Sequence, residues 1–321
     1  MRFTLLLAAT LLLGNHSTAS AQAIEDDHDD DHRVARIPAA KNVAVSICVS
    51  SGNIIIRGWD KSEVLADSSG EGRVDFRRRD GTEKTAPATT VDVLISDSDI
   101  DDPSGRAGCS SSGDITLNVP RDARLTVRTV EGDVDVDEVG EVKVESASGT
   151  LSVRRVANGV DLNTASGEVS VDEAGGRIRL RSISGGIVAN DLHPRDDGDA
   201  LSVNSTSGDV RLSRISLNNV EVRSISGGIY MNGPLARNAR YQMTTLSGDI
   251  TFVLPVNSSF HVEAKVFQGG DIVTDFPLKY TGNHQPSKIL AGGSIEGTVG
   301  SGESYLNLSS NSGTVRLRKK Q

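Results

Sequence analysis

The stretch Ser166-Gly167-Glu168-Val169 decides the fold, because close copies of it recur along this chain of 321 residues. Each copy combines a hydroxyl or acidic residue, a glycine, a variable residue and an aliphatic residue. The other copies in the most regular part are Ser112-Gly113-Asp114-Ile115, Glu131-Gly132-Asp133-Val134, Ser148-Gly149-Thr150-Leu151, Ser184-Gly185-Gly186-Ile187, Ser207-Gly208-Asp209-Val210, Ser226-Gly227-Gly228-Ile229 and Ser247-Gly248-Asp249-Ile250. Consecutive glycines are separated by 19, 17, 18, 18, 23, 19 and 21 residues, a period typical of stacked repeat proteins.

Aliphatic residues alternate with polar ones on both sides of each glycine. Around Gly149, for example, Val142 and Val144 stand before the glycine, and Leu151 and Val153 stand after it. Alternation of this kind predicts a strand with one buried face, and the glycine predicts a corner between two strands. Each turn of chain, which we call a coil and name by its glycine, is therefore expected to hold two short strands that pair in parallel with those of the next coil.

These patterns predict an all-β fold, a single-chain parallel β-solenoid (β-helix) with about 18–23 residues per coil and capped ends. Aromatic residues make up only 3% of the chain, which favours a thin aliphatic core over the thick core of a sandwich. Val144, Leu162 and Leu180 are expected to lie one above another in that core. The predicted corner glycines are Gly52, Gly113, Gly132, Gly149, Gly167, Gly185, Gly208, Gly227, Gly248, Gly270 and Gly313.

Residues 1–23 have the pattern of a signal peptide. Arg2 supplies a positive charge, Leu5 to Leu13 form an apolar run, and Ala21-Gln22-Ala23 is a small-x-small cleavage site. The run is too short for a transmembrane helix and no later segment approaches that length, so we expect no transmembrane segment. Residues 24–32 predict a disordered acidic leader. The expected location is the periplasm or the extracellular space.

Residues 33–321 are expected to form the solenoid. Its predicted parts are irregular opening coils with a cap at 33–110, regular coils at 111–255, and closing coils with a hairpin insertion at 256–321. Trp59, the only tryptophan, is expected to cover the first coil, because the open end of a solenoid core needs shielding. An exposed platform for a stacked ligand is the alternative role of this side chain.

The two cysteines occupy the same position in two repeats. Cys48 lies four residues before Gly52, and Cys109 lies four residues before Gly113. If these coils are neighbours, the two residues stack about 4.8 Å apart, within the Cα–Cα range of a disulfide. Export to an oxidising compartment favours the bond. We therefore predict a disulfide between Cys48 and Cys109.

Sites for chemistry are sparse in the sequence. The net charge of -9 argues against nucleic acid and anionic membranes as partners. We find no catalytic motif and predict no catalytic residues and no cofactor. Asp97, Asp99 and Asp101 are weak metal candidates that begin a calcium-loop alternation, but the glycine and glutamate that complete such a loop are missing, which favours a solvated loop. The acidic residues after the repeat glycines also lack the calcium-binding repeat pattern.

A column of hydroxyl residues stands three positions before successive glycines. Its members are Ser146, Thr164, Ser182, Ser205, Ser224 and Thr245. Short hydroxyl side chains at corners bond to the nearby backbone, and this is the favoured interpretation. Glycan binding is the alternative, if the column is exposed.

The chain resembles a known bacterial family. Gly52-Asn53-Ile54-Ile55-Ile56-Arg57-Gly58-Trp59-Asp60 and the many Ser-Gly-Asp/Gly-Ile/Val phrases resemble the "putative adhesin" family of β-solenoids, also described as toastrack-like. Gly270-Asp271-Ile272-Val273-Thr274-Asp275-Phe276-Pro277 is similar to the closing segment of that family. The resemblance covers roughly residues 40–320. It implies an envelope-associated β-solenoid and brings no catalytic residues.

We therefore predict a non-enzymatic exported β-solenoid, an adhesin or a binding or scaffold protein of the cell envelope. The expected partner is an envelope glycan or protein, and the oligomeric state is left open. The alternative is a polysaccharide-active β-helix enzyme, a lyase or a hydrolase, which needs clustered carboxylates or an Arg or Lys base on one face. The residues four positions before successive glycines are mixed in charge, which suits pairing between coils better than a substrate cleft.

Overall fold

The computed structural model describes residues 34–69, 73–81, 86–96, 109, 112–280 and 292–320. The predicted signal peptide (1–23) and acidic leader (24–32) lie outside the described residues. The described residues belong to one compact unit. None of the described residues belongs to a helix that is long and apolar enough to cross a membrane.

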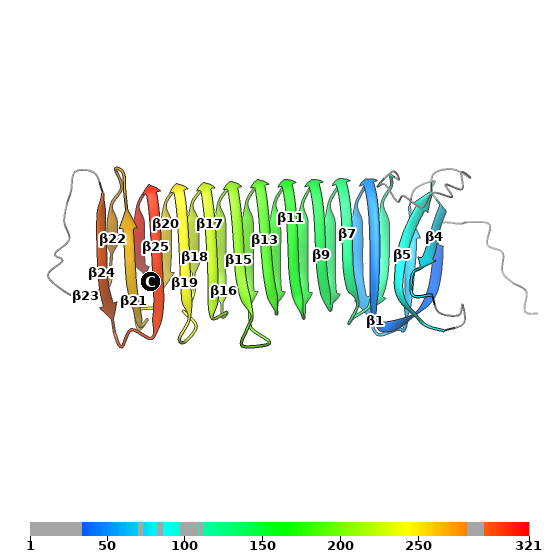
Figure 1. Ribbon diagram of the computed structural model, residues 1–321, viewed down its shortest axis with the longest axis horizontal. Helices are drawn as coiled ribbons and strands as arrows, with labels where there is room; N and C mark the ends of the chain where they lie inside the picture. The colour runs from blue at the N-terminus through cyan, green and yellow to red at the C-terminus, as the bar shows by residue number, and fades with distance from the viewer. Residues whose placement is uncertain are drawn as a thin grey trace, which may run out of the picture. The chain divides into compact units, whose positions relative to one another are not determined.

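Two sheets build a parallel β-solenoid, and each regular coil contributes one strand to each sheet (Figure 1). In order along the stack, sheet A contains β3 (Glu63–Ser68), β6 (Ile115–Pro120), β2 (Ile54–Trp59), β8 (Val134–Val139), β10 (Leu151–Val156), β12 (Val169–Ala174), β14 (Ile187–Leu192), β16 (Val210–Ile215), β18 (Ile229–Asn232), β20 (Ile250–Leu254), β26 (Val315–Lys319) and β22 (Ile272–Thr274). In the same order, sheet B contains β4 (Arg73–Arg78), β5 (Ala88–Ser96), β1 (Val34–Ser51), β7 (Arg124–Glu131), β9 (Glu141–Ser148), β11 (Gly159–Ser166), β13 (Arg177–Ser184), β15 (Ala200–Ser207), β17 (Asn219–Ser226), β19 (Arg240–Ser247), β25 (Ser304–Ser312), β21 (Phe260–Val266), β24 (Gly293–Val299) and β23 (Lys279–Tyr280).

The interior between the sheets is a narrow aliphatic core. Leu162 pairs with Val144 on one side and with Leu180 on the other, and all three side chains are fully buried. The same in-register stacking continues along the array, so one column of side chains fills the core from coil to coil. The predicted fold class and the predicted stacking of these three residues are confirmed.

The eleven predicted corner glycines form one continuous ladder. A Cβ atom placed on Gly167 would lie 2.0 Å from the carbonyl oxygen of Gly149. Ten of the glycines meet a neighbouring glycine in this way, at 1.9–2.3 Å, and the eleventh, Gly113, is itself the neighbour of Gly52. The corners therefore approach too closely for any side chain.

In five consecutive coils the second corner is also left-handed, and it uses residues other than glycine. Glu138, Arg155, Glu173, Asp191 and Arg214, each six positions after a corner glycine, have φ between 49° and 59°. Their charged side chains project outward, and Arg155 pairs with Glu138 while Arg214 pairs with Asp191. This corner was not predicted, because a charged residue in the sequence does not indicate a positive φ.

The order of coils at the N-terminal end differs from the order of the sequence. Strand β1 pairs with β5 and β7, and β2 pairs with β6 and β8. The Gly52 coil therefore lies between the Gly113 and Gly132 coils, as the blue strand of Figure 1 shows. Trp59 lies in this second coil, so the prediction that it covers the end of the stack is wrong. Its indole N–H donates to the carbonyl oxygen of Glu63 at 2.9 Å.

The C-terminal end has the same arrangement. Strand β25 pairs with β19 and β21, and β26 pairs with β20 and β22. The Gly313 coil, the last of the sequence, is therefore inserted between the Gly248 and Gly270 coils. Figure 1 shows this strand in red between yellow and orange neighbours.

Antiparallel strands cover both ends of the stack. At the first end, β4 pairs antiparallel with β5, and β3 pairs antiparallel with β6 and with the first part of β1. At the other end, β24 pairs antiparallel with β21 and β23, and residues 281–291 of the predicted hairpin insertion lie outside the described residues. Phe276 is buried there against the edge of Phe260, with ring centroids 5.3 Å apart, and closes the core.

Candidate functional site

The outer face of sheet B presents straight columns of side chains. Because the coils are in register, residues at the same distance from the corner glycine line up across neighbouring strands. The column four positions before the glycine is polar, with Arg181, Asn204 and Arg223 on consecutive strands. The column two positions before it contains Ile183 and Ile225 with Thr206 between them. These two columns lie next to the ladder of corner glycines.

A groove of about 730 Å³ lies over these columns. It is lined by Asn163, residues 181–183, 204–206, 223–225 and 244–246, Phe267, Ser309 and Asn311. We call this feature the outer groove. It extends from β11 to β25 on sheet B and reaches Phe267 beyond β21, so a long ligand placed in it crosses the strands rather than following one of them.

Large apolar side chains protrude along the outer groove. Ile183 is 59% exposed and Ile225 is 50% exposed, and Leu246 and Phe267 are exposed to similar degrees. Solitary exposed apolar residues are normal on protein surfaces, but a row of them along one groove is typical of an interaction surface. Val130 occupies the same column and is exposed, but it lies outside the groove.

The hydroxyl column forms the floor beneath these residues. Thr164, Ser205 and Thr245 are buried, and each donates to a backbone carbonyl oxygen at the corner. The interpretation as corner hydroxyls therefore holds for these members. Ser182 and Ser224 differ: their residues are 4% and 6% exposed, yet their Oγ atoms have no hydrogen-bond partner within the described residues. Both line the outer groove.

A repeated heptapeptide marks the same two coils. Residues 181–187 and 223–229 both read Arg-Ser-Ile-Ser-Gly-Gly-Ile. They supply both arginines, both protruding isoleucines and both unsatisfied serines of the groove. The groove was not predicted from the sequence. The sequence signal for it is the identity of these two heptapeptides, because their outward Arg and Ile repeat as well as their corner glycines.

The acidic column after the corner glycines has a structural role. Asp209 Oδ1 accepts the backbone N–H of Gly228 at 2.9 Å, and Asp249 Oδ1 accepts that of Thr314 at 2.7 Å. Each carboxylate thus bonds to the backbone of the next coil in the stack. Within the described residues no group of acidic, histidine or cysteine side chains is placed to hold a metal ion. The weak metal candidates Asp97, Asp99 and Asp101 lie outside the described residues.

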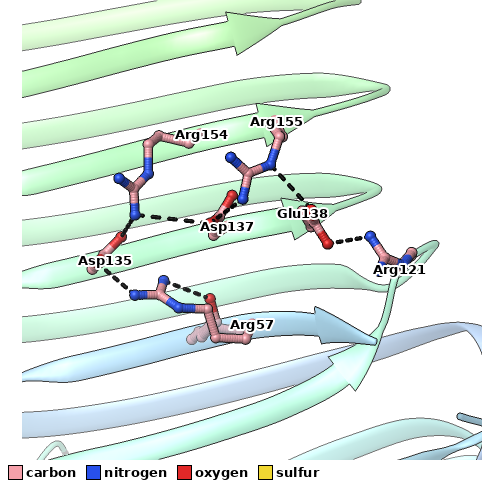
Figure 2. A network of polar contacts seen from close by, with 8 residues as sticks. Arg57, Arg121, Asp135, Asp137, Glu138, Arg154 and Arg155 are labelled. Atoms are coloured by element: carbon pink, nitrogen blue, oxygen red, sulfur yellow. Dashed lines mark hydrogen bonds and ion pairs between the residues drawn. The ribbon is translucent and has the colours of Figure 1, made fainter. Parts of the chain in front are cut away.

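A charged network covers part of the outer face of sheet A (Figure 2). Asp135 accepts a hydrogen bond from Arg57 at 2.8 Å, and this bond lowers the pKa of the Asp135 carboxyl. Arg154 lies 3.6 Å from Asp135 and 3.8 Å from Asp137, and Arg155 also bonds to Asp137. Positive and negative groups alternate from coil to coil in this network and pair with each other. It therefore stabilises the stack and does not offer free charge to a ligand.

A second depression on sheet B, of about 440 Å³, also has mixed charge. Arg177 and Arg179 line it together with Asp161, Asp196 and Asp199. Asp199 Oδ2 accepts backbone N–H groups of the loop that overhangs the depression, at 2.7 and 2.9 Å. This carboxylate therefore fixes the loop. The outer groove, by contrast, has two arginines and no acidic residue among its lining.

The structure joins Cys48 and Cys109 by a disulfide, with Cα atoms 4.8 Å apart. Their coils are neighbours, since Ser51 and Ser112 form a parallel bridge. The bond therefore ties the inserted Gly52 coil to the Gly113 coil that covers it.

Parallel in-register coils, a ladder of corner glycines and an open outer groove define a solenoid of the toastrack class. A family model described as Toastrack DUF4097 matches residues 113–318. The chain belongs to this family, and the fold expected from the resemblance is confirmed. No curated protein matches the chain.

Solved structures with similarity to this chain come from two bacterial genera. One is described as a putative cell adhesion protein from Clostridium sporogenes ATCC 15579, with 10% identity over 89% of this chain and 99% of that chain and a TM-score of 0.25. Another is described as a putative adhesin from Parabacteroides merdae ATCC 43184, with 10% identity over 69% of this chain and 88% of that chain and a TM-score of 0.37. A third, described as a putative adhesin from Parabacteroides distasonis ATCC 8503, has 9% identity over 88% of this chain and 95% of that chain and a TM-score of 0.31.

Proposed function

We propose that this protein is a non-enzymatic, exported binding protein of the cell envelope, and that the outer groove is its binding site. The observation that carries the proposal is the row of exposed apolar residues, from Ile183 to Phe267, beside Arg181 and Arg223. Burying such residues against a ligand is favourable by about 1.5–3 kcal/mol for each large aliphatic side chain. The arginines add directional donors that fix the position of the ligand.

Two further features support the proposal. The signal-peptide pattern of residues 1–23 and the disulfide between Cys48 and Cys109 both fit an oxidising compartment outside the cytoplasm. The groove also lacks the carboxylate pair that a polysaccharide hydrolase needs, since none of its described lining residues is acidic. Binding therefore fits this site better than hydrolysis.

The test is co-sedimentation of the purified protein with isolated cell envelopes of the producing organism. We expect the double variant Ile183→Ser/Ile225→Ser to bind at least about tenfold more weakly than the wild type, because two buried aliphatic contacts are lost. Val130→Ser is the matched control: it changes the same column, in a coil outside the groove. All of these side chains are exposed, so thermal unfolding should change little. Equal binding by the double variant and the wild type would contradict the proposal.

A further inference from the structure

Across β11, β13, β15 and β17 the outward residues of the groove repeat every second coil. On β19, exposed Leu246 directly follows Ile225 and ends this alternation in the apolar column. In the polar column Asn163, Arg181, Asn204 and Arg223 alternate, and in the neighbouring column Ala165, Ile183, Thr206 and Ile225 alternate. The unsatisfied hydroxyls of Ser182 and Ser224 follow the same double period. An arginine, an isoleucine and a free hydroxyl therefore recur together, two coils apart.

Stacking alone explains only part of this double period. Alternating Arg with Asn keeps like charges from facing each other on adjacent strands. Charge repulsion does not explain the alternation of Ile183 and Ile225, which are 59% and 50% exposed. These features indicate a ligand that itself repeats at the spacing of two coils.

The spacing limits what that ligand is. Parallel strands lie about 4.8 Å apart, so equivalent groups recur about 9.6 Å apart along the groove. In a β-1,4-linked polysaccharide consecutive sugars are turned over relative to each other, so the same face recurs at every second sugar. One sugar per coil then gives Arg181 and Ile183 the same contact as Arg223 and Ile225. The hydroxyl-rich edges of the chain suit Asn, Ser and Thr side chains, and the C–H faces suit the isoleucines.

A peptide fits the same groove less well. Peptides that bind sheets add as strands and use unpaired backbone groups at a sheet edge. The groove lies over the middle of sheet B, where the backbone of β13, β15 and β17 is paired on both sides. Recognition there must come from side chains, and the side chains present are donors and acceptors suited to a polyol.

The charge of the groove adds one more constraint. Its lining includes Arg181 and Arg223 and no acidic residue, although the chain as a whole has a net charge of -9. Arg181 lies 3.5 Å from Asp161, and Arg223 pairs with Glu221, both outside the groove lining. Each guanidinium has five N–H donors, so donors remain for a ligand. Guanidinium groups recognise carboxylates through paired hydrogen bonds.

We propose that the outer groove binds a linear, acid-bearing, β-1,4-linked polysaccharide that runs across the strands of sheet B with one sugar per coil. The inference rests on the proposed function, and it adds the chemical class and the direction of the ligand. Arg181 and Arg223 bind carboxylates two sugars apart, and Ile183 and Ile225 contact the faces of the same two sugars.

The test is calorimetric titration of the purified protein with oligomers of β-1,4-linked mannuronic acid. Affinity should rise with length up to about six sugars, which is the span of the groove at one sugar per coil. The neutral control ligands are β-1,4-linked mannose oligomers of equal length, which should bind at least about tenfold more weakly because no carboxylate meets the arginines. The double variant Arg181→Gln/Arg223→Gln should lose at least about tenfold in affinity for the acidic oligomers. Arg128→Gln is the matched control, in the same column outside the groove, and should bind like the wild type.

Three results overturn the inference. Equal binding of neutral and acidic oligomers removes the role of the arginines. Tighter binding of poly-L-glutamate than of the sugar acids makes the occupant a peptide. Absence of binding to the acidic oligomers, while Ile183→Ser/Ile225→Ser still loses envelope binding, rejects the polysaccharide and keeps the groove as the site. If that double variant binds envelopes as the wild type does, the proposed function itself fails.

Discussion

At the residue scale, the corner glycines leave no room for a side chain. Gly167 has φ of +137°, and a Cβ atom there would lie 2.0 Å from the carbonyl oxygen of Gly149. Two independent effects thus exclude a side chain: the backbone conformation, and the approach of the next coil. The second effect is specific to stacked coils, because it acts on glycines whose φ is unremarkable as well.

We expect Gly167→Ala to lower the free energy of unfolding by roughly 3 kcal/mol or more, because the coils must separate locally to admit a methyl group. Urea unfolding followed by circular dichroism measures the change. Gly198→Ala is the control, since a Cβ at Gly198 meets nothing within 4 Å. A Gly167→Ala variant as stable as this control would show that the ladder can spread at little cost.

Tyr241 is a polar side chain in the aliphatic core. Its hydroxyl accepts the backbone N–H of Ala236 at 2.8 Å, and its ring packs edge-on against Phe252. Burial raises the pKa of the Tyr241 hydroxyl to about 12, above its ordinary value of 10.0. The folded state therefore keeps the phenol neutral at pH values where the unfolded chain ionises it.

The contribution of the neutral Tyr241 phenol to stability is complete below pH 10, and it is lost as the pH rises towards 12. At pH 7 Tyr241→Phe should be less stable than the wild type by about 1 kcal/mol, because the Ala236 N–H loses its partner. Between pH 10 and 12 the difference should shrink, since phenylalanine does not ionise. Urea unfolding of both proteins at several pH values checks this, and a constant difference would contradict it.

At the scale of elements, side chains join each coil to the next beyond the backbone pairing of the sheets. The residues directly after the corner glycines alternate strictly between acidic and neutral when they are read in order along the stack. That order is Asp114, Asn53, Asp133, Thr150, Glu168, Gly186, Asp209, Gly228, Asp249, Thr314 and Asp271. Each neutral position lets a neighbouring carboxylate reach the backbone without facing another negative charge. The inserted coils supply Asn53 and Thr314 where the sequence order would have placed two acids side by side.

Asp249 shows what one such carboxylate contributes. The backbone N–H of Thr314 and the side chain of Arg316 lower the pKa of the Asp249 carboxyl. We expect Asp249→Ala to cost about 1 kcal/mol at pH 7, the usual value of one hydrogen bond. Because the folded-state pKa is lowered, the contribution is present above the unfolded pKa of about 3.9 and is lost as the pH falls through the lowered value.

Thermal unfolding of the two proteins from pH 7 to pH 2.5 measures this effect, and the two curves should converge in acid. Glu168→Ala is the control, because Glu168 has the same place in its coil and its side chain makes no hydrogen bond within the described residues. A difference that persists unchanged at low pH would rule out the carboxylate as its cause.

The sequence was sufficient for features that depend on local pattern. The period of two identified strands such as β11 and β13, the glycines identified the corners, and the shared position of Cys48 and Cys109 predicted the distance between them. The insertion of the Gly52 and Gly313 coils was not predicted, because a hydrophobic pattern shows that a coil exists and not which coil lies beside it. The acidic column does carry that information, since only the inserted order makes it alternate. The groove was not predicted, because the pattern around Ile183 is also that of an ordinary corner phrase.

At the scale of the whole molecule, the two ends follow one rule. The first and last coils of the solenoid sequence are each second from the end of the stack, and each is covered by a coil from further inside the sequence. The covering coils in turn have antiparallel strands at their outer edges. Both ends of sheet B and the first end of sheet A therefore finish in an antiparallel strand, whereas the other end of sheet A finishes in the short parallel strand β22. Short or covered edges are less open to strands from other molecules.

Removal of residues 303–321 should therefore also destabilise strands that the deletion leaves intact. The Gly270 coil loses its parallel partners β25 and β26, although its own sequence and the β24 strand on its other side are intact. We expect amide hydrogen exchange in Phe260–Val266 to become fast, because its parallel partner β25 is gone. Exchange in β11 and β13, in the middle of the array, should stay slow. Retained protection of Phe260–Val266 would show that it docks directly on β19.

The placement of the last strands also affects how the molecule is assembled. If a nascent chain forms its coils in the order of the sequence, the Gly270 coil is complete at residue 275 while the position between it and the Gly248 coil is still empty. That position is filled only by β25 and β26, which come later in the chain. A polypeptide cut by proteolysis or stopped before residue 304 is therefore left with a Gly270 coil that has no parallel neighbour.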